Sequence, residues 1–255
     1  MKSMRTFDFP VRWAALALVT GLLLLSGVAE AVDERLKTTG QTTCYDPTGD
    51  TLNEIPCAGT GQYGDIQAGK HKGYTDQGNS TILDLDTRLI WEKKSWDGSI
   101  HDQKRVYSFG DAFKHADTLN HICAKDESVS CSTANDCKKA GVGGKCGFGG
   151  RQDWRVPNLT ELRSIISAGT FEPAVPEVFN TNCVEGATVL TGSCTEYLDC
   201  HEQHQNRNPG GDHWSSTSFI SDPRFAQSIG FDDGSGPEDL KERNFCVRAV
   251  AGFGL

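Results

Sequence analysis

Apolar and polar residues alternate most clearly just after residue 80. Residues 82–86 read Ile-Leu-Asp-Leu-Asp, and the apolar run 89–91 (Leu-Ile-Trp) follows a polar segment at 86–88. A period of two with a polar break predicts a short β-hairpin over 82–91. Three later runs, at 214–219, 225–231 and 245–250, have the same strand-like character.

Helical spacing appears twice. Between 108 and 123, apolar residues collect on one face and Ser108 stands where an N-cap is expected. The residues on this face are Phe109, Ala112, Phe113, Ala116, Leu119 and Ile122, and Cys123 is expected to end the helix. After Pro157, Asn158 and Glu161 have the spacing of a capping box, which predicts a second helix that Gly169 ends. Two helices, short strands and long loops predict a single α+β domain.

The first 31 residues have the three parts of a secretory signal peptide. Lys2, Arg5 and Arg12 make a basic start, an apolar run covers 14–28, and 29–31 (Ala-Glu-Ala) is an A-x-A cleavage site. The apolar run is shorter than the roughly 20 residues that a membrane-spanning helix needs. We therefore expect cleavage after residue 31 and a mature chain without a membrane span. It would be secreted or held at the cell surface, in the bacterial periplasm or outside the cell.

Charge and cysteine content narrow the class of protein. With 25 Lys and Arg against 34 Asp and Glu, the formal charge is −9, which argues against nucleic acid as a partner. All ten cysteines follow residue 31, and an even number in an exported chain predicts five disulfides. No pair has C-x-x-C spacing, which excludes thioredoxin-type redox motifs, haem attachment and zinc ribbons.

The chain divides into an arm and a main domain after the signal peptide. Residues 32–72 are polar and glycine-rich, and we interpret them as an N-terminal arm in which Cys44 and Cys57 close a local loop. Residues 73–251 are expected to form the main domain. Two long loops, 124–150 and 180–212, carry six further cysteines: Cys131, Cys137, Cys146, Cys183, Cys194 and Cys200.

Five segments in series give the main domain a family resemblance. They are L-I-W-E-K-K at 89–94, D-G-S-I-H-D at 97–102, D-W-R-V-P-N-x-x-E-L at 153–162, W-S-S-T at 214–217 and C-V-R at 246–248. In that order they resemble the Lcl C-terminal domain family, named from a bacterial collagen-like adhesin. The resemblance implies a variant of the C-type lectin fold and extracellular members, the best understood of which are adhesins that bind sulfated polysaccharides. This chain lacks a collagen-like repeat and the lectin-type calcium motifs, and its acidity does not suit a polyanionic ligand.

The signature residues have structural interpretations. Trp91, Trp154 and Trp214 are expected in the core. Arg155 is expected to pair with a buried carboxylate or carbonyl and to lock the turn at Pro157, and Glu161 is expected to cap the second helix.

The lectin-like fold implied by the resemblance would also fix one long-range disulfide. It ties the first helix to the closing strand, which here would join Cys123 to Cys246. One of the three cysteines at 124–150 would then need a partner among those at 180–212, unless another chain supplies it.

Candidate ligand residues lie on two loops. The residues named for ligand binding are Asn208, Asp212, His213, Asp232 and Asp233. The acidic, glycine-rich segment 232–239 offers the oxygen ligands that calcium prefers, through Asp232, Asp233, Glu238 and Asp239, with a solvated hairpin loop as the alternative. No other cofactor is expected.

The sequence carries no recognisable catalytic arrangement. It has no nucleophile elbow, and the predicted disulfides leave no free cysteine, so no enzymatic activity is expected and no catalytic residue is named. The expected function is a secreted binding module for adhesion or attachment, with a glycan or an extracellular protein as ligand. The alternative is a structural or assembly subunit of an extracellular polymer or filament, a homo-oligomer in which the arm docks on a neighbour.

Overall fold

The structure is a computed structural model that describes residues 36–48, 53–196, 198, 200 and 211–252. The predicted signal peptide at 1–31 and the candidate ligand residue Asn208 lie outside these residues. Within the described ranges, no helix combines the length and the apolar character needed to cross a membrane.

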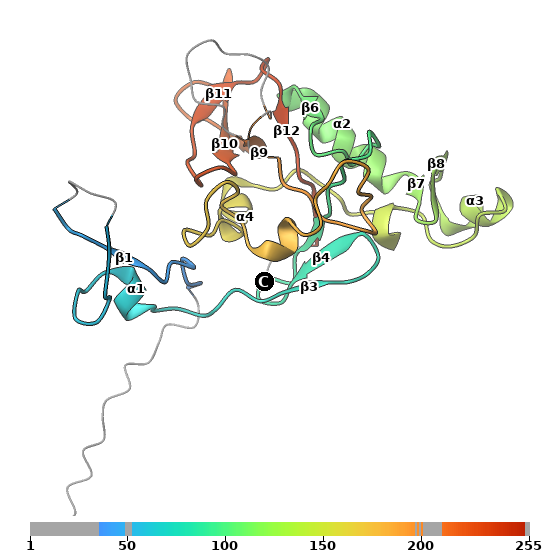
Figure 1. The fold of residues 1–255 in the computed structure, drawn as a ribbon. Coiled ribbons are helices and arrows are strands. Elements are labelled where there is room, and N and C mark those ends of the chain that lie inside the picture. Colours follow the sequence, from blue (N-terminus) through green and yellow to red (C-terminus); the bar gives the residue numbers. More distant parts are fainter. Residues whose placement is uncertain (1–35, 49–52, 197, 199, 201–210, 253–255) are drawn as a thin grey trace, which may run out of the picture. The chain divides into compact units, whose positions relative to one another are not determined.

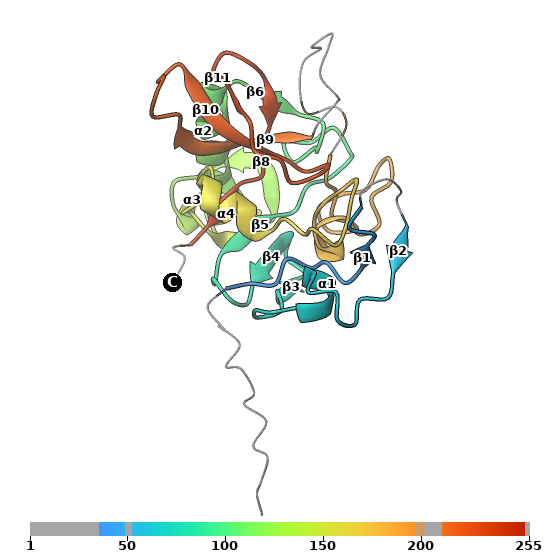
Figure 2. The same cartoon turned by 90° about the vertical axis from the view of Figure 1, so that its left-hand side faces the viewer.

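The larger of two main sheets has five strands, and its neighbours β9, β10 and β11 lie side by side in Figures 1 and 2. In spatial order the strands are β11 (Glu238–Leu240), β10 (Phe225–Gly230), β9 (Asp212–Ser218), β12 (Phe245–Cys246) and β6 (Val106–Tyr107). β12 and β9 run parallel, with Cys246 opposite His213, and the other neighbouring pairs run antiparallel. The predicted strand runs at 214–219 and 225–231 supply β9 and β10.

The second main sheet contains the predicted hairpin. Its four strands are β13 (Val250–Ala251), β5 (Ile90–Glu92), β4 (Thr81–Asp84) and β3 (Tyr74–Asp76). β4 and β5 pair with Ile82 opposite Trp91, which confirms the hairpin. The Asp84 carboxylate accepts hydrogen bonds from the amides of Asp86 and Thr87 and so stabilises the turn between the two strands.

The first predicted helix forms, with two differences from the prediction. In α2 (Phe109–Asn120), the Ser108 hydroxyl accepts the amide of Asp111 at 3.2 Å, as an N-cap does. The helix ends three residues before Cys123, because 122–123 already form a strand. Phe113 is 43% exposed and so does not lie on the buried face of the helix. His115 lies on that face instead, together with Ala112.

The second predicted helix, α4 (Leu159–Ser164), has the expected capping box. The amide of Glu161 donates to Asn158 Oδ1 at 2.9 Å, and the amide of Asn158 donates to Glu161 Oε2 at 2.8 Å. The helix ends before Gly169, which lies in the following loop. The shorter helices are α1 (Tyr63–Ile66), α3 (Ala134–Lys139) and the 3-10 turns η1 (Phe148–Gly150) and η2 (Glu177–Phe179).

All three signature tryptophans are buried, which confirms the prediction. Trp91 packs with the apolar face of α4 and with Phe179, Trp214 packs with α2 and Phe245, and Trp154 packs with Phe148. Each tryptophan therefore anchors a separate apolar cluster between sheets and helices.

Five disulfides pair all ten cysteines. They are Cys44–Cys57, Cys123–Cys137, Cys131–Cys146, Cys183–Cys194 and Cys200–Cys246. The predicted bridge in the arm is confirmed. The predicted Cys123–Cys246 bridge is wrong, because Cys246 in β12 is bonded to Cys200 and Cys123 to Cys137. With Cys123 paired locally, no disulfide joins the two long loops.

Residues 122–150, most of which we expected to be a plain loop, contain a small folded unit. β7 (Ile122–Cys123) pairs with β8 (Asp126–Ser130), and α3 follows with a capping box between Thr133 and Asp136. Two disulfides begin and end inside this unit, which we call the insertion, and its sulfur atoms form a compact cluster with Val129 and Val142 around it.

The described part of the arm packs on the main domain of its own chain. β1 (Cys44–Tyr45) and β2 (Glu54–Ile55) pair across the local disulfide. Lys37 forms an ion pair with Asp84, and the amide of Ala168 donates to the carbonyl of Thr39 at 2.7 Å. A side chain on Gly169 would lie 2.0 Å from the carbonyl oxygen of Gly40, so this contact requires the glycine.

Candidate functional site

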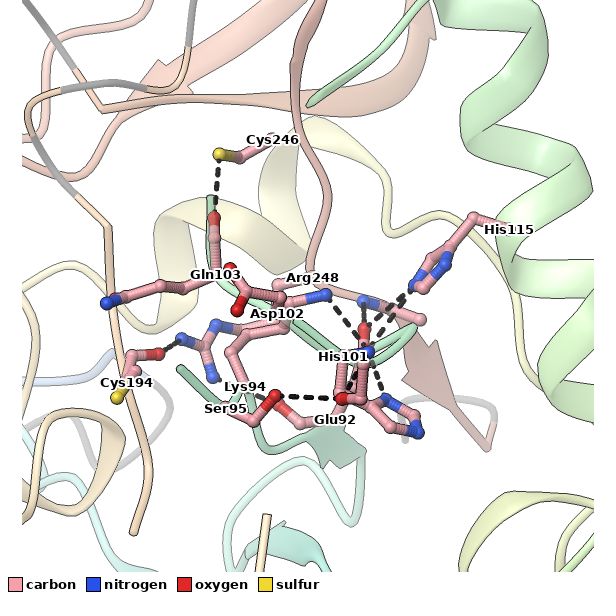
Figure 3. Close-up of polar contacts among 12 residues, drawn as sticks. Glu92, Lys94, Ser95, His101, Asp102, Gln103, His115, Cys194, Cys246 and Arg248 are labelled. Carbon is pink, nitrogen blue, oxygen red and sulfur yellow. Dashed lines mark hydrogen bonds and ion pairs between the residues drawn. The ribbon is translucent and has the colours of Figure 1, made fainter. Parts of the chain in front are cut away.

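A cluster of charged side chains is buried where β5 ends, beside α2 (Figure 3). Glu92, the last residue of β5, is fully buried and accepts four hydrogen bonds. Lys94 Nζ and His101 Nδ1 lie 3.0 and 2.8 Å from its Oε1 atom. His115 Nε2 and the amide of Ala249 lie 3.3 and 2.9 Å from its Oε2 atom. Both carboxylate oxygens are therefore fully engaged.

Charge compensation inside this cluster decides the protonation of its members. Burial by itself raises the pKa of Glu92, but Lys94 and the two histidines lower it well below its ordinary value. Burial lowers the pKa of Lys94, and Glu92 opposes that shift. Burial also lowers the pKa of His115, in keeping with a neutral ring that donates to Glu92.

Arg248 extends the cluster toward the loop closed by the Cys183–Cys194 disulfide. Its guanidinium is fully buried and lies 5.4 Å above the ring of Phe179. It donates to the carbonyls of Glu92 and Cys194 and to the hydroxyl of Thr195. Burial lowers its pKa to about 10, so the group stays charged at neutral pH. The cluster thus joins β5, α2 and the 183–195 loop, and we assign it a structural role.

His101 connects this cluster to the surface. Its ring stacks on Phe148, with centroids 4.1 Å apart, and Nδ1 contacts Glu92. Its Nε2 atom lies 3.2 Å from Glu127 Oε2, but the two are not aligned as a hydrogen bond. Burial by itself lowers the pKa of His101, yet Glu127 and Glu92 raise it above its ordinary value.

Glu127 belongs to the lining of a surface groove of about 700 Å³. Three segments form it: the turn between β3 and β4, the insertion with η1, and the loop closed by Cys183–Cys194. The lining residues are Asn79, Ser80, Ala124, Lys125, Asp126, Glu127, Ser128, Gly144, Lys145, Gly149, Gly150, Val189 and Leu190.

The groove combines charge with aliphatic surface. Leu190 is 69% exposed, and Lys125 and Lys145 are exposed as well. The Asp126 carboxylate is occupied by the amide and hydroxyl of Ser128. None of the described lining residues has an aromatic ring. The volume of the groove lies within the ordinary range of ligand pockets, and most of its lining residues are polar, charged or glycine.

The structure separates the residues predicted to bind ligand. His213 is buried, stacks on Phe231 with centroids 3.9 Å apart, and contacts the carbonyl of Gly211 at 2.7 Å. Burial lowers its pKa to about 3, with Arg248 adding to the shift. The expectation that His213 faces a ligand is therefore wrong, because β9 directs it into the interior.

The acidic residues of segment 232–239 also lie in different surroundings. Asp239 is buried and pairs with Arg243, Asp233 accepts the amide of Ser235, and Glu238 is exposed. The four residues predicted to bind calcium therefore do not share one set of contacts. Calcium binding by this segment stays a prediction.

Two of the predicted residues, Asp212 and Asp232, do approach one another beside Gly230. A side chain on Gly230 would place its Cβ 2.5 Å from Asp232 Oδ1 and 3.5 Å from Asp212 Oδ1. The Asp232 Oδ1 atom is buried without a described hydrogen bond. Burial and Asp233 raise the pKa of Asp232.

Arg155 and Glu161 have the roles that the sequence predicts. The guanidinium donates two parallel hydrogen bonds to Glu161, at 2.7 and 2.6 Å, and a third to the carbonyl of Gly252. Glu161 also closes the capping box of α4. Beside them, the carbonyl of Pro157 accepts the amide of Ser216, which joins the turn to β9.

The buried network and the groove are not predicted by local sequence patterns. Glu92, His101 and Arg248 lie in three of the segments that carry the family resemblance, and that recurrence was the available signal. Charged residues are rarely buried without partners. The partners here are distant in sequence, so local patterns gave no reason to place these groups inside.

A family model described as the Lcl C-terminal domain matches residues 80–251, which cover the buried network and every lining residue of the groove except Asn79. Among curated proteins, none matches the chain.

Proposed function

We propose that this chain, which belongs to the Lcl C-terminal domain family, is a non-enzymatic extracellular binding module. The proposed ligand-binding place is the groove beside Leu190. The five disulfides fit an extracellular or periplasmic protein. The lectin-like form of the α+β fold and a role in adhesion or attachment, both implied by the family, are parts of this proposal.

The observation that carries the proposal is the construction of the groove. Two of its three walls are held by disulfides, two bridges in the insertion and one at Cys183–Cys194. Its exposed aliphatic and charged side chains sit above a rigid buried network. Recognition loops on a rigid scaffold are the usual arrangement in binding modules.

The composition of the groove favours a protein ligand over a glycan. Sugar rings pack well on aromatic faces, and the described lining offers Val189 and Leu190 instead. An extended peptide can place an aliphatic side chain on these two residues and polar groups along the insertion.

The test uses the exported chain from residue 32 onward, probed on a peptide array and on a glycan array, with calcium and with chelator. Leu190→Asp changes the groove, and Ile220→Asp is the matched control, because Ile220 is 98% exposed and does not line the groove. We expect peptide binding that Leu190→Asp removes and Ile220→Asp leaves intact. Binding that ignores Leu190→Asp would contradict the proposal.

Two further readouts test the parts of the proposal that concern calcium and assembly. Chelator-sensitive binding would support the predicted calcium site near Asp232. Light scattering tests the assembly-subunit alternative, for which concentration-dependent polymers are expected. A monomer at all concentrations would support the binding module.

A further inference from the structure

The groove contains a carboxylate whose partner beneath it is a buried, imperfectly bonded histidine. Glu127 is 33% exposed on its side chain, whereas His101 is buried. The Nδ1 atom of His101 forms a hydrogen bond with Glu92. Its Nε2 atom faces Glu127 but does not have the geometry of a hydrogen bond. Buried polar atoms in native proteins are nearly always bonded, so this nitrogen calls for an explanation.

The surroundings of Glu127 leave it little freedom to move. It lies in β8, which is paired with β7 and flanked by the disulfides Cys123–Cys137 and Cys131–Cys146. Its backbone is therefore held, and the ring of His101 lies directly against its carboxylate, with Nε2 3.2 Å from Oε2. That ring is itself clamped between Phe148 and Glu92.

We propose that Glu127 binds a basic side chain of a protein ligand in the groove, and that His101 is the positioning residue that sets the strength of this contact. The inference rests on the proposed function. It adds the chemical class of one ligand group and a dependence on the protonation of His101.

The direction of the pH dependence follows from the groups around His101. Glu92 from β5 and Glu127 from β8 face its two nitrogens, and Asp97, His115 and Lys94 are the other titratable groups that interact within this cluster. While the ring is charged, it attracts the Glu127 carboxylate and competes with a basic ligand group.

When the pH rises, the proton on Nε2 leaves to solvent and Nδ1 keeps its bond to Glu92. The Nε2 lone pair then faces Glu127, whose full charge becomes available to the ligand. Because the ordinary pKa of histidine is about 6.5 and Glu127 raises that of His101, ligand binding should tighten above pH 6.5. By linkage, the bound ligand should lower the pKa of His101.

The lysines of the groove do not satisfy Glu127 in this structure. Lys125 and Lys145 are exposed, and neither forms an ion pair within the described ranges. Their long side chains can turn toward solvent, where they would favour acidic residues flanking the basic group of the ligand.

The first measurement needs no ligand. An NMR titration of His101 in the exported chain is compared with Glu127→Gln, which keeps the shape and removes the charge. Glu177→Gln is the matched control, because Glu177 is exposed and does not line the groove. We expect the pKa of His101 to fall in Glu127→Gln and to stay unchanged in Glu177→Gln. An unchanged pKa in both variants would overturn the coupling.

The second measurement uses a capped synthetic peptide of alternating leucine and lysine as the probe, by calorimetry at pH 6.0 and 8.5. In the unmodified chain we expect tighter binding at the higher pH. Glu127→Gln should weaken binding at pH 8.5 by at least about tenfold, as expected for a lost hydrogen bond between charged groups, and should flatten the pH dependence.

Equal weakening by Glu177→Gln would mean unspecific charge attraction and would overturn the proposal. A ligand that depends on Leu190 but not on Glu127 would overturn this inference while the proposed function stands. The absence of any Leu190-dependent ligand would overturn both.

Discussion

Two buried histidines have pKa values shifted in opposite directions. His101 lies between Glu92 and Glu127, and these carboxylates raise its pKa although burial opposes the charge. His213, a residue of β9, packs its ring against Phe231 with a carbonyl as its polar partner, and burial lowers its pKa to about 3. Burial alone therefore does not fix the charge of a histidine; the balance between burial and the charged groups around its ring does.

The comparison separates two kinds of interior in one small domain. Around His213, burial and the nearby positive charge of Arg248 together keep the ring neutral. Around Glu92 the interior behaves as a preorganised polar site, where donors from α2 and from the segment between β5 and β6 are already in place. Only the second kind passes a change of charge to the surface, through Glu127.

The largest expected effect comes from removing the central charge of the polar site. Glu92→Gln leaves Lys94 and His101 facing a neutral amide in a dry interior. We expect the free energy of unfolding to fall by about 3–5 kcal/mol, as for other broken buried ion pairs. Urea denaturation at pH 7 measures this, with Glu177→Gln as the control that should change it by less than about 0.5 kcal/mol. A loss below 1 kcal/mol would mean that the cluster is solvated.

The next largest effect concerns the free energy of unfolding at acidic pH. The native chain keeps His213 neutral down to about pH 3, whereas the unfolded chain takes up a proton near pH 6.5. Stability should therefore fall by up to about 1.4 kcal/mol per pH unit from this residue as the pH drops through that window. His213→Asn, which can still donate to Gly211, should remove this slope, so its cost should shrink at low pH. Denaturation curves at pH 4, 5, 6 and 7 test this.

His101→Asn should show the opposite trend. The native pKa of His101 is raised, so its stabilising charge is fully present below about pH 6.5 and is lost as the pH rises through the native value. The cost of the substitution should be greatest at pH 6 and smaller at pH 8.5. Parallel pH trends for the two histidine variants would break the distinction between the two interiors.

The smallest effect is expected at a pair open to water. Arg155 is about one third exposed on its side chain where it meets Glu161. Arg155→Lys loses the two parallel hydrogen bonds but keeps the positive charge, and water screens the remaining attraction to Glu161. We expect a loss of about 1 kcal/mol or less by thermal denaturation. A loss as large as that of Glu92→Gln would show that exposure is a poor guide here.

The parts of the fold that depend on neighbouring residues were predictable from the sequence. The 82–91 hairpin, the caps at Ser108 and Asn158, the short Cys44–Cys57 bridge and the burial of the three tryptophans were expected and are present. In each case the relevant interaction spans a few residues or follows from the size of an apolar side chain.

The parts that depend on distant partners were not predictable in the same way. His115 replaces Phe113 on the inner face of α2 because Glu92, 23 residues away, is there to receive it. Cys246 pairs with Cys200 because of strand order, which no local pattern specifies. The groove arises where three loops meet, and neither charge nor periodicity marks such a place.

The two disulfides of the insertion have a consequence for how this family can vary. Because both bridges begin and end between Cys123 and Cys146, the whole segment can be exchanged as a cassette without rewiring any other cysteine. The insertion, which forms one wall of the groove, can therefore change in sequence while the rest of the domain stays the same. Grafting this cassette between members would be a direct route to new specificities.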